Sequence, residues 1–253
     1  CNIFHSHRLG SVTKPIDFQD LQITIEKSIK ASEELKNAAK VHRELEHVQQ
    51  ELKTARTVQE SILPTTFSIL PENANCEIFG TMTPAKEVGG DFYDFFMIDE
   101  HRLAMVIGDV SGKGRPAALF MAMSRTRLKA TAMQSADITE CITSVNYTLG
   151  KDNTRGMFVT LFYGILDLRS YKISFVNCGH HPPCLVGDSE VPEILDRSEN
   201  IPLGLQDDFA FASSEMTLDE GTSLLLYTDG ITEATNPAGD RFNLEGVLAS
   251  LKD

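Results

Sequence analysis

The chain has 253 residues, of which 42% are hydrophobic and 23% charged, so it can form one sizeable globular domain or one domain plus an extension. Its formal charge of −13 argues against nucleic acid and anionic membrane surfaces as partners, because both attract clustered Lys and Arg. The same charge suits a site that binds cations.

The cysteines favour a reducing compartment, and the hydropathy pattern offers no membrane span. Five cysteines are scattered without a Cys-x-x-Cys spacing, which is typical of buried or free thiols. No apolar run approaches the roughly 18 residues of a membrane span. No signal peptide is visible, although the chain starts at Cys1 and is expected to be a fragment. We therefore expect a cytoplasmic protein.

Residues 1–16 are too few to form a core and are expected to belong to a larger upstream domain. They place Lys14-Pro15 shortly before a helix with an acidic start, which resembles the last turn of a two-component receiver domain. A loop that ends in Asp17 as a helix N-cap is an equally good interpretation. The first interpretation makes an upstream sensor or receiver domain a partner of this chain.

Residues 17–63 are predicted to form one long helix, because they are polar, favour helix and contain neither Gly nor Pro. Apolar residues within them alternate spacings of three and four, the pattern of a heptad seam of about three repeats. An amphipathic helix lying on its own domain is one interpretation. We favour a parallel coiled-coil dimer, because the stripe is narrow and its flanks are Glu, Lys, Arg and Gln. The seam consists of Ala38, Val41, Leu45, Val48, Leu52 and Ala55, and its next two positions are Gln59 and Ile62.

From residue 76 onward, short β-rich runs are separated by turns rich in Gly, Asp, Asn or Pro, which favours antiparallel pairing. Two helices are predicted between them, at about 116–133 and 138–149. Strands, a helix pair and more strands predict an α+β fold with sheets covered by helices. The predicted strands are 76–83, 92–98, 103–107, 158–166, 172–177 and 223–227.

Three acidic segments carry the candidate chemistry, and each places an Asp beside Gly at the end of an apolar run. Asp91 follows two glycines, Asp109 stands at the turn after the run 103–107, and Asp229 ends the run 224–227. A partly desolvated carboxylate at a strand end is costly without a cation. Oxygen ligands of this kind suit Mg²⁺ or Mn²⁺ rather than zinc. Each segment alone is a common turn, so the ordered set carries the argument.

A series of short motifs follows in a fixed order. They are Arg56-Thr-Val-Gln-Glu-Ser-Ile-Leu-Pro64, Glu87-Val-Gly-Gly-Asp-Phe-Tyr-Asp94, Gly108-Asp-Val-Ser-Gly-Lys-Gly114 with Pro116-Ala-Ala-Leu119, Met157-Phe-Val-Thr160, Asn177-Cys-Gly-His-His-Pro-Pro183, Pro202-Leu-Gly-Leu205 and Tyr227-Thr-Asp-Gly-Ile-Thr-Glu-Ala234. In this order they resemble the metal-dependent (PPM) Ser/Thr phosphatases, and specifically the bacterial branch of SpoIIE and RsbU. The first motif is similar to the helix-to-domain junction of that branch.

The resemblance implies a four-layer α-β-β-α sandwich over residues 64–253, with a two-metal site at one edge. By motif position it implies that Asp109, beside the Val110 carbonyl, bridges two Mn²⁺ or Mg²⁺ ions. Asp229 would bind one of them, and Asp91 would bind a metal or orient a bound water. It further implies hydrolysis of phosphoserine or phosphothreonine on a STAS-type anti-anti-sigma factor in a partner-switching circuit, and dimerisation through the helical linker.

Two features depart from the family pattern. The family ends with an Asp-Asp-Ile/Thr segment on a late strand, whereas this chain stops at 251–253 inside the expected preceding helix. We therefore expect a C-terminally truncated domain that binds metal poorly or is inactive as given. Arg115 stands where a small or apolar residue is expected. Arg115 and Lys113 are candidates for contacts with the substrate phosphate, and a solvated surface position is the alternative for both.

Other interpretations remain for the histidines and for the function. His180-His181 invites a metal or acid–base role, but we favour a strand end followed by a turn, because the family's hard-metal site does not need imidazole. A degenerate phosphatase fold that binds a signalling partner without catalysis is the main alternative function, and the persistence of all three Asp residues argues against it. A two-metal nucleotide cyclase finds no support in the order of the motifs.

Overall fold

The computed structural model describes residues 18–72, 74–84, 88–135, 137–151, 153, 155–187, 192–195 and 199–251. The chain divides after Thr54 into two units, and the second unit, Ala55–Asp253, holds all the strands that the structure describes. Helix α1 (Phe18–Ile62) confirms the predicted long helix. The predicted receiver-like remnant 1–16 lies outside the described residues. Within the described ranges, no helix combines the length and apolar character needed to cross a bilayer.

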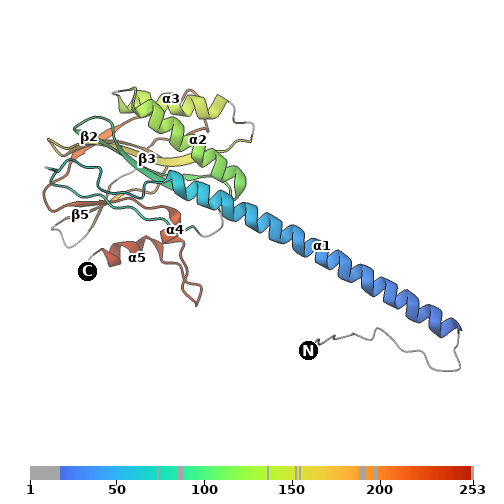
Figure 1. The fold of residues 1–253 in the computed structure, drawn as a ribbon. Helices are drawn as coiled ribbons and strands as arrows, with labels where there is room; N and C mark the ends of the chain where they lie inside the picture. The colour runs from blue at the N-terminus through green and yellow to red at the C-terminus, as the bar shows by residue number, and fades with distance from the viewer. Residues whose placement is uncertain are drawn as a thin grey trace. The chain divides into compact units, whose positions relative to one another are not determined.

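Two antiparallel sheets form the centre of the second unit (Figure 1). The larger sheet has the strand order β1-β2-β3-β4-β7 and the smaller one β6-β5-β8. The strands are β1 (Phe92–Met97), β2 (Arg102–Val110), β3 (Val159–Asp167), β4 (Lys172–Cys178), β5 (Cys184–Val186), β6 (Glu193–Ile194), β7 (Ser214–Thr217) and β8 (Ser223–Leu225).

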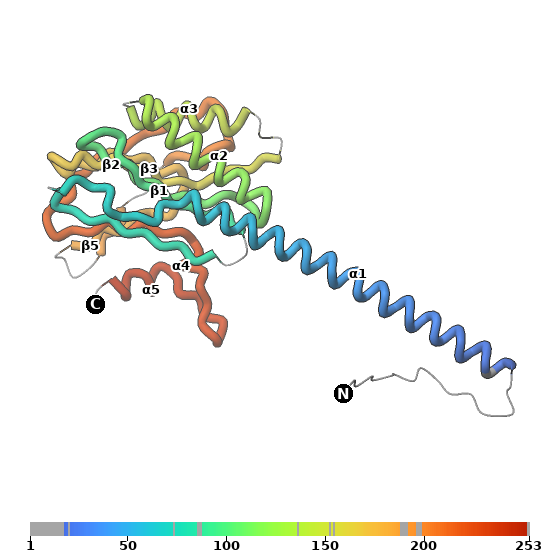
Figure 2. Tube along the Cα trace, viewed as in Figure 1, coloured from blue at the N-terminus to red at the C-terminus, as the bar shows by residue number. Residues whose placement is uncertain are grey.

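Helices lie on both sides of the sheets. α2 (Arg115–Ala132) and α3 (Ile138–Lys151) pack against each other and against the larger sheet. α4 (Asp229–Thr232) and α5 (Asn243–Ser250) lie on the opposite side of the domain, as the tube view also shows (Figure 2). This arrangement confirms the predicted α+β sandwich of antiparallel sheets between helices.

The two-residue period of the strands divides the core into two layers. Alternate side chains such as Val106 and Tyr163 turn toward α2 and α3. Their neighbours, such as Leu103 and Phe162, turn toward the second sheet and pack near Leu224 of β8. A side chain's position in this alternation therefore decides which layer it enters.

Several predicted elements differ from the structure. The prediction of a strand at 76–83 was wrong, because these residues form no β-ladder. Cys76 and Ile78 still pack against the second core layer. The alternation of apolar residues in this run therefore reflects burial of one side of the segment, without pairing to another strand. Asp109 lies inside β2 rather than in the turn after it, and β8 ends at Leu225, so Asp229 begins α4 rather than ending a strand. The short strands β5, β6 and β7 were not predicted.

Candidate active site

Asp91, the residue just before β1, lies beside Asp109 near the end of β2. Phe92 pairs with Gly108 in the antiparallel register of β1 and β2, and extending this register by one residue places Asp91 opposite Asp109, whose side chain is hydrogen-bonded to it. Directly opposed residues of an antiparallel pair point to the same face. The sequence separates these two carboxylates by a hairpin, and the register brings them together.

The alternation of side chains also determines which face the pair occupies. In β1, Phe92 turns toward the helices and Phe95 toward the second sheet. In β2, Val110 turns toward the helices. Asp91 and Asp109 are each one residue away from a helix-facing position, so they lie on the side of the second sheet. The chain returns to this side after β8, and Asp229 follows there.

The electrostatics of the pair follow from this placement. Burial raises the pKa of Asp109 to about 7, and a hydrogen bond with Asp91 and the negative charges of Asp91 and Asp229 act in the same direction. Like charges this close resist simultaneous ionisation. The three carboxylates therefore form a centre of excess negative charge that a cation would relieve.

Asp229 is linked to the pair through its neighbour in the chain. The Thr228 hydroxyl donates a hydrogen bond of 2.7 Å to Oδ2 of Asp91. Asp229 itself is half-buried at the first position of α4. Sequence reasoning missed Thr228, although it stands inside the Tyr-Thr-Asp-Gly motif; a hydroxyl next to a candidate ligand was the available signal.

The backbone of Val110 is closely approached by Gly90, the residue before Asp91. Val110 is buried, and a Cβ added at Gly90 would lie 2.8 Å from the Val110 carbonyl oxygen and 3.0 Å from its Cβ. No side chain fits at residue 90 without displacing Val110. The two glycines before Asp91 thus differ in role, since a Cβ at Gly89 would meet nothing closer than 3.9 Å.

The predicted phosphate-binding residues are more exposed than the carboxylates of this centre. Lys113 is exposed in the loop between β2 and α2, and Arg115 is exposed at the first position of α2. Neither lines the pocket beside Asp229. Their contact with a substrate stays a prediction.

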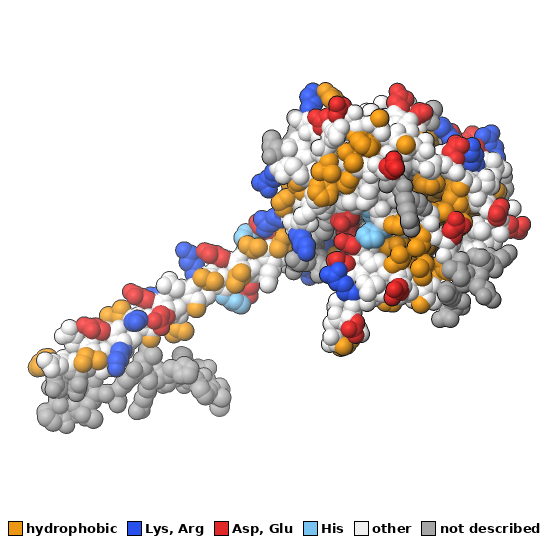
Figure 3. Space-filling model, turned by 180° about the vertical axis from the view of Figure 1, so that it is seen from behind, with side chains coloured by type: hydrophobic (Ala, Val, Ile, Leu, Met, Phe, Trp, Pro, Cys, Tyr) orange, Lys and Arg blue, Asp and Glu red, His pale blue; other side chains and the backbone are white. Residues whose placement is uncertain are grey.

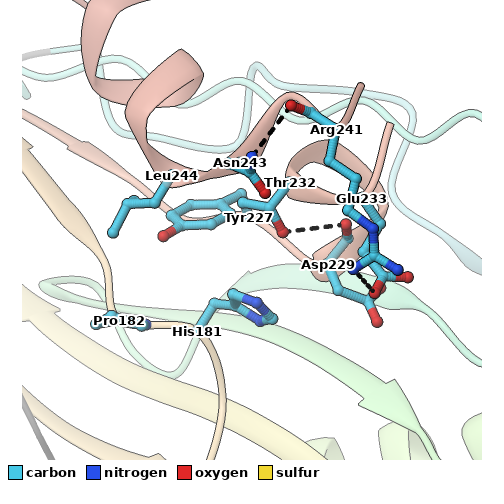
Figure 4. Close-up of a pocket in the computed structure, with 9 residues that line it drawn as sticks. All are labelled: His181, Pro182, Tyr227, Asp229, Thr232, Glu233, Arg241, Asn243 and Leu244. Carbon is cyan, nitrogen blue, oxygen red and sulfur yellow. Dashed lines mark hydrogen bonds and ion pairs between the residues drawn. The ribbon is translucent and has the colours of Figure 1, made fainter. Parts of the chain in front are cut away.

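A pocket of about 370 Å³ opens beside Asp229. Figure 4 shows the ring of Tyr227 and the side chain of His181 on one part of its wall, with the guanidinium of Arg241 near Asp229. Arg241 forms an ion pair of 3.1 Å with Glu233 at this end. The space-filling view shows acidic side chains beside a histidine in a hollow of the surface (Figure 3). The remaining lining residues are Pro182, Thr232, Asn243 and Leu244.

The donor set fits hard divalent cations in its chemistry, although the carboxylates do not form a closed ligand shell. Among the described residues, no three acidic, histidine or cysteine side chains are arranged to hold a metal ion by themselves. The carboxylate pair and the nearby Asp229 are oxygen donors, which Mg²⁺ and Mn²⁺ prefer. The raised pKa of Asp109 is what such a set shows when no cation balances its charge.

Comparison with known proteins places these features in a family. The family model of stage II sporulation protein E (SpoIIE) matches residues 99–253. The chain is 29% identical over 228 residues to protein IcfG of Synechocystis sp., and this match covers 79% of this chain and 35% of IcfG. It is 26% identical over 202 residues to phosphoserine phosphatase RsbU of Bacillus subtilis, covering 78% of this chain and 59% of RsbU. The chain thus spans about a third to three-fifths of the length of these relatives.

The fold agrees with a solved structure. The SiaA-PP2C domain of Pseudomonas aeruginosa matches with a TM-score of 0.65 at 19% identity, and the match covers 83% of each chain. The SpoIIE model covers more than half of the chain and includes the segments that contain Asp109 and Asp229. The chain therefore belongs to the SpoIIE family of PP2C-type bacterial Ser/Thr phosphatases.

Proposed function

We propose that this chain is the catalytic part of a metal-dependent protein phosphatase that hydrolyses phosphoserine or phosphothreonine on a regulatory protein. The observation that supports it best is the opposed pair Asp91 and Asp109, with Asp229 close enough to raise the pKa of Asp109. Three carboxylates held close together repel one another, and a bound cation would offset this repulsion. When bound, two Mn²⁺ or Mg²⁺ ions would supply an activated water and neutralise charge on the phosphate.

The protein's own groups have separate tasks in this proposal. Asp109 and the Val110 carbonyl sit at the end of β2, where pairing of Asp109 with Thr160 and of Val110 with Val159 in β3 fixes their positions. Asp91 stands just before β1 and is oriented by the Thr228 hydroxyl. Asp229 brings a third carboxylate from the start of α4. Lys113, exposed on the loop that follows Val110, and Arg115, exposed at the first position of α2, are proposed to contact the substrate phosphate.

The pocket beside Asp229 is proposed to receive the residues that flank the phosphorylated side chain. Its wall combines the apolar surfaces of Tyr227 and Leu244 with the polar groups of Arg241 and Asn243 (Figure 4). A peptide that enters there would bring its phosphate past Asp229. This geometry suits a protein substrate better than a free phosphate ester, because a small ester would leave the pocket unfilled.

The proposed substrate is a phosphorylated STAS-type anti-anti-sigma factor within a partner-switching circuit. Its support is the family and the similarity to RsbU, a phosphoserine phosphatase of Bacillus subtilis. The chain's charge of −13 is consistent with a protein partner rather than nucleic acid.

The test uses the full-length protein with Mn²⁺ and a phosphoserine form of a STAS protein. We expect phosphate release that is abolished by Asp109→Asn, because the amide removes the carboxylate shared by the site. Asp219→Asn, which changes an exposed carboxylate in a turn before β8, is the matched control and should leave release unchanged. Undiminished release by Asp109→Asn would contradict the metal assignment. Binding of the STAS protein without any release would favour the adaptor function.

We also propose that the protein dimerises in parallel through α1. The seam residues Val41, Leu45 and Val48 are 54%, 56% and 42% exposed along the helix, so their apolar surface is available to a second copy. Leu52 and Ala55 continue the stripe toward the end of the seam. Leu45→Glu should reduce the dimer fraction in sedimentation velocity, because it places a charge in the seam. Gln50→Glu, off the seam, is the control; equal sedimentation of both variants would contradict the dimer.

A further inference from the structure

His180 is a buried side chain that connects separate segments of the candidate site. Its exposed fraction is 6%. Its Nδ1 lies 3.0 Å from the Thr160 hydroxyl, and its Nε2 lies 3.1 Å from the main-chain carbonyl oxygen of Tyr227. One imidazole ring thus joins β3 to the segment that precedes α4.

Each partner of the ring adjoins a candidate metal ligand. Thr160 is paired with Asp109 in the register of β2 and β3, and its hydroxyl lies 3.4 Å from the Asp109 carbonyl oxygen. Tyr227 stands two residues before Asp229. The ring therefore spans the distance between the strand next to Asp109 and the segment that carries Asp229.

The partners fix the protonation of the ring. A main-chain carbonyl only accepts hydrogen bonds, so Nε2 carries the proton and donates to Tyr227. Nδ1 is then an acceptor, and the Thr160 hydroxyl donates to it. Burial lowers the pKa of His180 to about 4, so the ring is neutral near pH 7. With both nitrogens engaged, the ring has no lone pair left for a metal.

The turn around His180 is held by a different set of bonds. Its main-chain N–H donates to Oδ1 of Asn177 at 2.7 Å, and Nδ2 of Asn177 donates to the His180 carbonyl at 3.2 Å. This clamp does not involve the imidazole. The fold of the turn therefore does not explain why the ring is a histidine.

We propose that His180 is a positioning residue for the metal site: its neutral ring sets the spacing between the Asp109 strand and the Asp229 segment. The inference rests on the proposed function and refines it. Removing a group that hydrogen-bonds a metal ligand directly typically changes metal affinity by about 10- to 100-fold, and His180 lies one residue further from the ligands. The ring acts on the ligands without touching them or the substrate.

The two hydrogen bonds of the ring, to Thr160 and to Tyr227, are the two arms of a bridge, and two substitutions test them separately. In His180→Gln the side-chain amide can reach the Nε2 position and donate to Tyr227, but the Thr160 hydroxyl loses Nδ1 and keeps only the more distant Asp109 carbonyl oxygen, at 3.4 Å. In His180→Asn the amide oxygen can replace Nδ1 for Thr160, but it loses Tyr227. Both arms are needed to hold the spacing, so each variant of the full-length protein should bind Mn²⁺ on the order of tenfold more weakly in calorimetry.

Thr160→Val supplies the matched partner for a double-mutant cycle. It removes the same arm as His180→Gln, so the loss of Mn²⁺ affinity in the double variant should not exceed that of either single variant. Asn177→Ala is the structural control. It removes the turn clamp, so it should lower the urea midpoint while changing Mn²⁺ affinity less than the His180 variants do. Imidazole ¹⁵N shifts of the metal-free wild type should report the Nε2–H tautomer at pH 7.

Failure of this inference and failure of the proposed phosphatase function give different outcomes. Wild type that fails to bind Mn²⁺ overturns the proposed function and the inference together. Wild type that binds, with the two His180 variants equal to it in Mn²⁺ affinity, overturns the inference alone. An Nδ1–H or charged ring at pH 7 also overturns it, because neither form fits the two hydrogen bonds.

Discussion

The side-chain amide of Gln59 and the peptide groups of Gly89 form a two-bond clamp. Nε2 of Gln59 donates to the Gly89 carbonyl at 2.6 Å, and the Gly89 N–H donates to Oε1 of Gln59 at 3.2 Å. Gln59 is buried, and Ile62 packs against the core of the same unit. These two positions of the predicted seam thus face the domain, and the clamp holds Gly89, two residues before Asp91.

Gln59→Ala should destabilise the protein, because both Gly89 groups lose their partner inside the protein. Leaving such groups unsatisfied costs about 1–3 kcal/mol each, and water that enters the gap lowers the sum. We therefore expect the free energy of unfolding in urea to fall by about 2 kcal/mol. Gln50→Ala, exposed on the same helix, should change it by less than about 0.5 kcal/mol.

The same clamp predicts a functional coupling. If α1 acts on the site through Gln59, deletion of the residues before Ala55 should change phosphatase activity in the wild type. In the Gln59→Ala background, the same deletion should change it less. Equal effects of the deletion in both backgrounds would show that the helix acts by another route.

Gly90→Ala should be much more harmful than Gly89→Ala. The new Cβ at residue 90 would lie 2.8 Å from the Val110 carbonyl oxygen, whereas one at residue 89 would meet nothing closer than 3.9 Å. We expect Gly90→Ala to cost about 1–3 kcal/mol of unfolding free energy. It should also weaken Mn²⁺ binding, because Val110 must move. Similar urea midpoints for the two variants would contradict the close approach.

Asp94→Ala should destabilise the domain by about 3 kcal/mol, because it leaves the mostly buried Arg125 without its partner. Asp94 in β1 forms ion pairs with Arg125 at 2.9 Å and Lys129 at 3.6 Å, both on α2, and its side chain is 2% exposed. Glu215→Ala, which breaks an exposed pair with Lys172, should cost less than about 1 kcal/mol. Urea unfolding of both variants checks this, and equal costs would contradict it.

In the metal-free protein, the contribution of Asp109 to stability should fall as the pH rises from about 4 to about 7. The folded-state pKa of Asp109 is raised from 3.8 to about 7, so in this window Asp109 binds more protons in the folded state than in the unfolded state. The contribution of this group to the free energy of unfolding then falls with rising pH. Asp109→Asn lacks this contribution, so its stability relative to wild type should be greater at pH 8 than at pH 5. Urea unfolding with EDTA at the two pH values measures this, and a constant difference would contradict it.

Much of the fold could be predicted because its signals are local. The helix periodicity of 18–62, the helix pair around Pro116 and 138–149, and four of the longer strands follow from side chains a few residues apart. The run 76–83 shows the limit of this reasoning. Its alternation matches a strand, yet pairing depends on whether a neighbouring strand is available, and the run itself does not contain that information.

The sequence by itself predicted which residues would carry the proposed chemistry: Asp91, Asp109 and Asp229 stand in ordered motifs whose side chains suit hard cations. Only the tertiary structure decided how they meet. The register of β1 and β2 opposes Asp91 to Asp109, and the side-chain alternation turns both toward the sheet from which Asp229 follows. The bridge through His180 joins segments 20 and 47 residues from it in the chain. Hydrogen bonds over such separations depend on strand pairing, which no local pattern encodes.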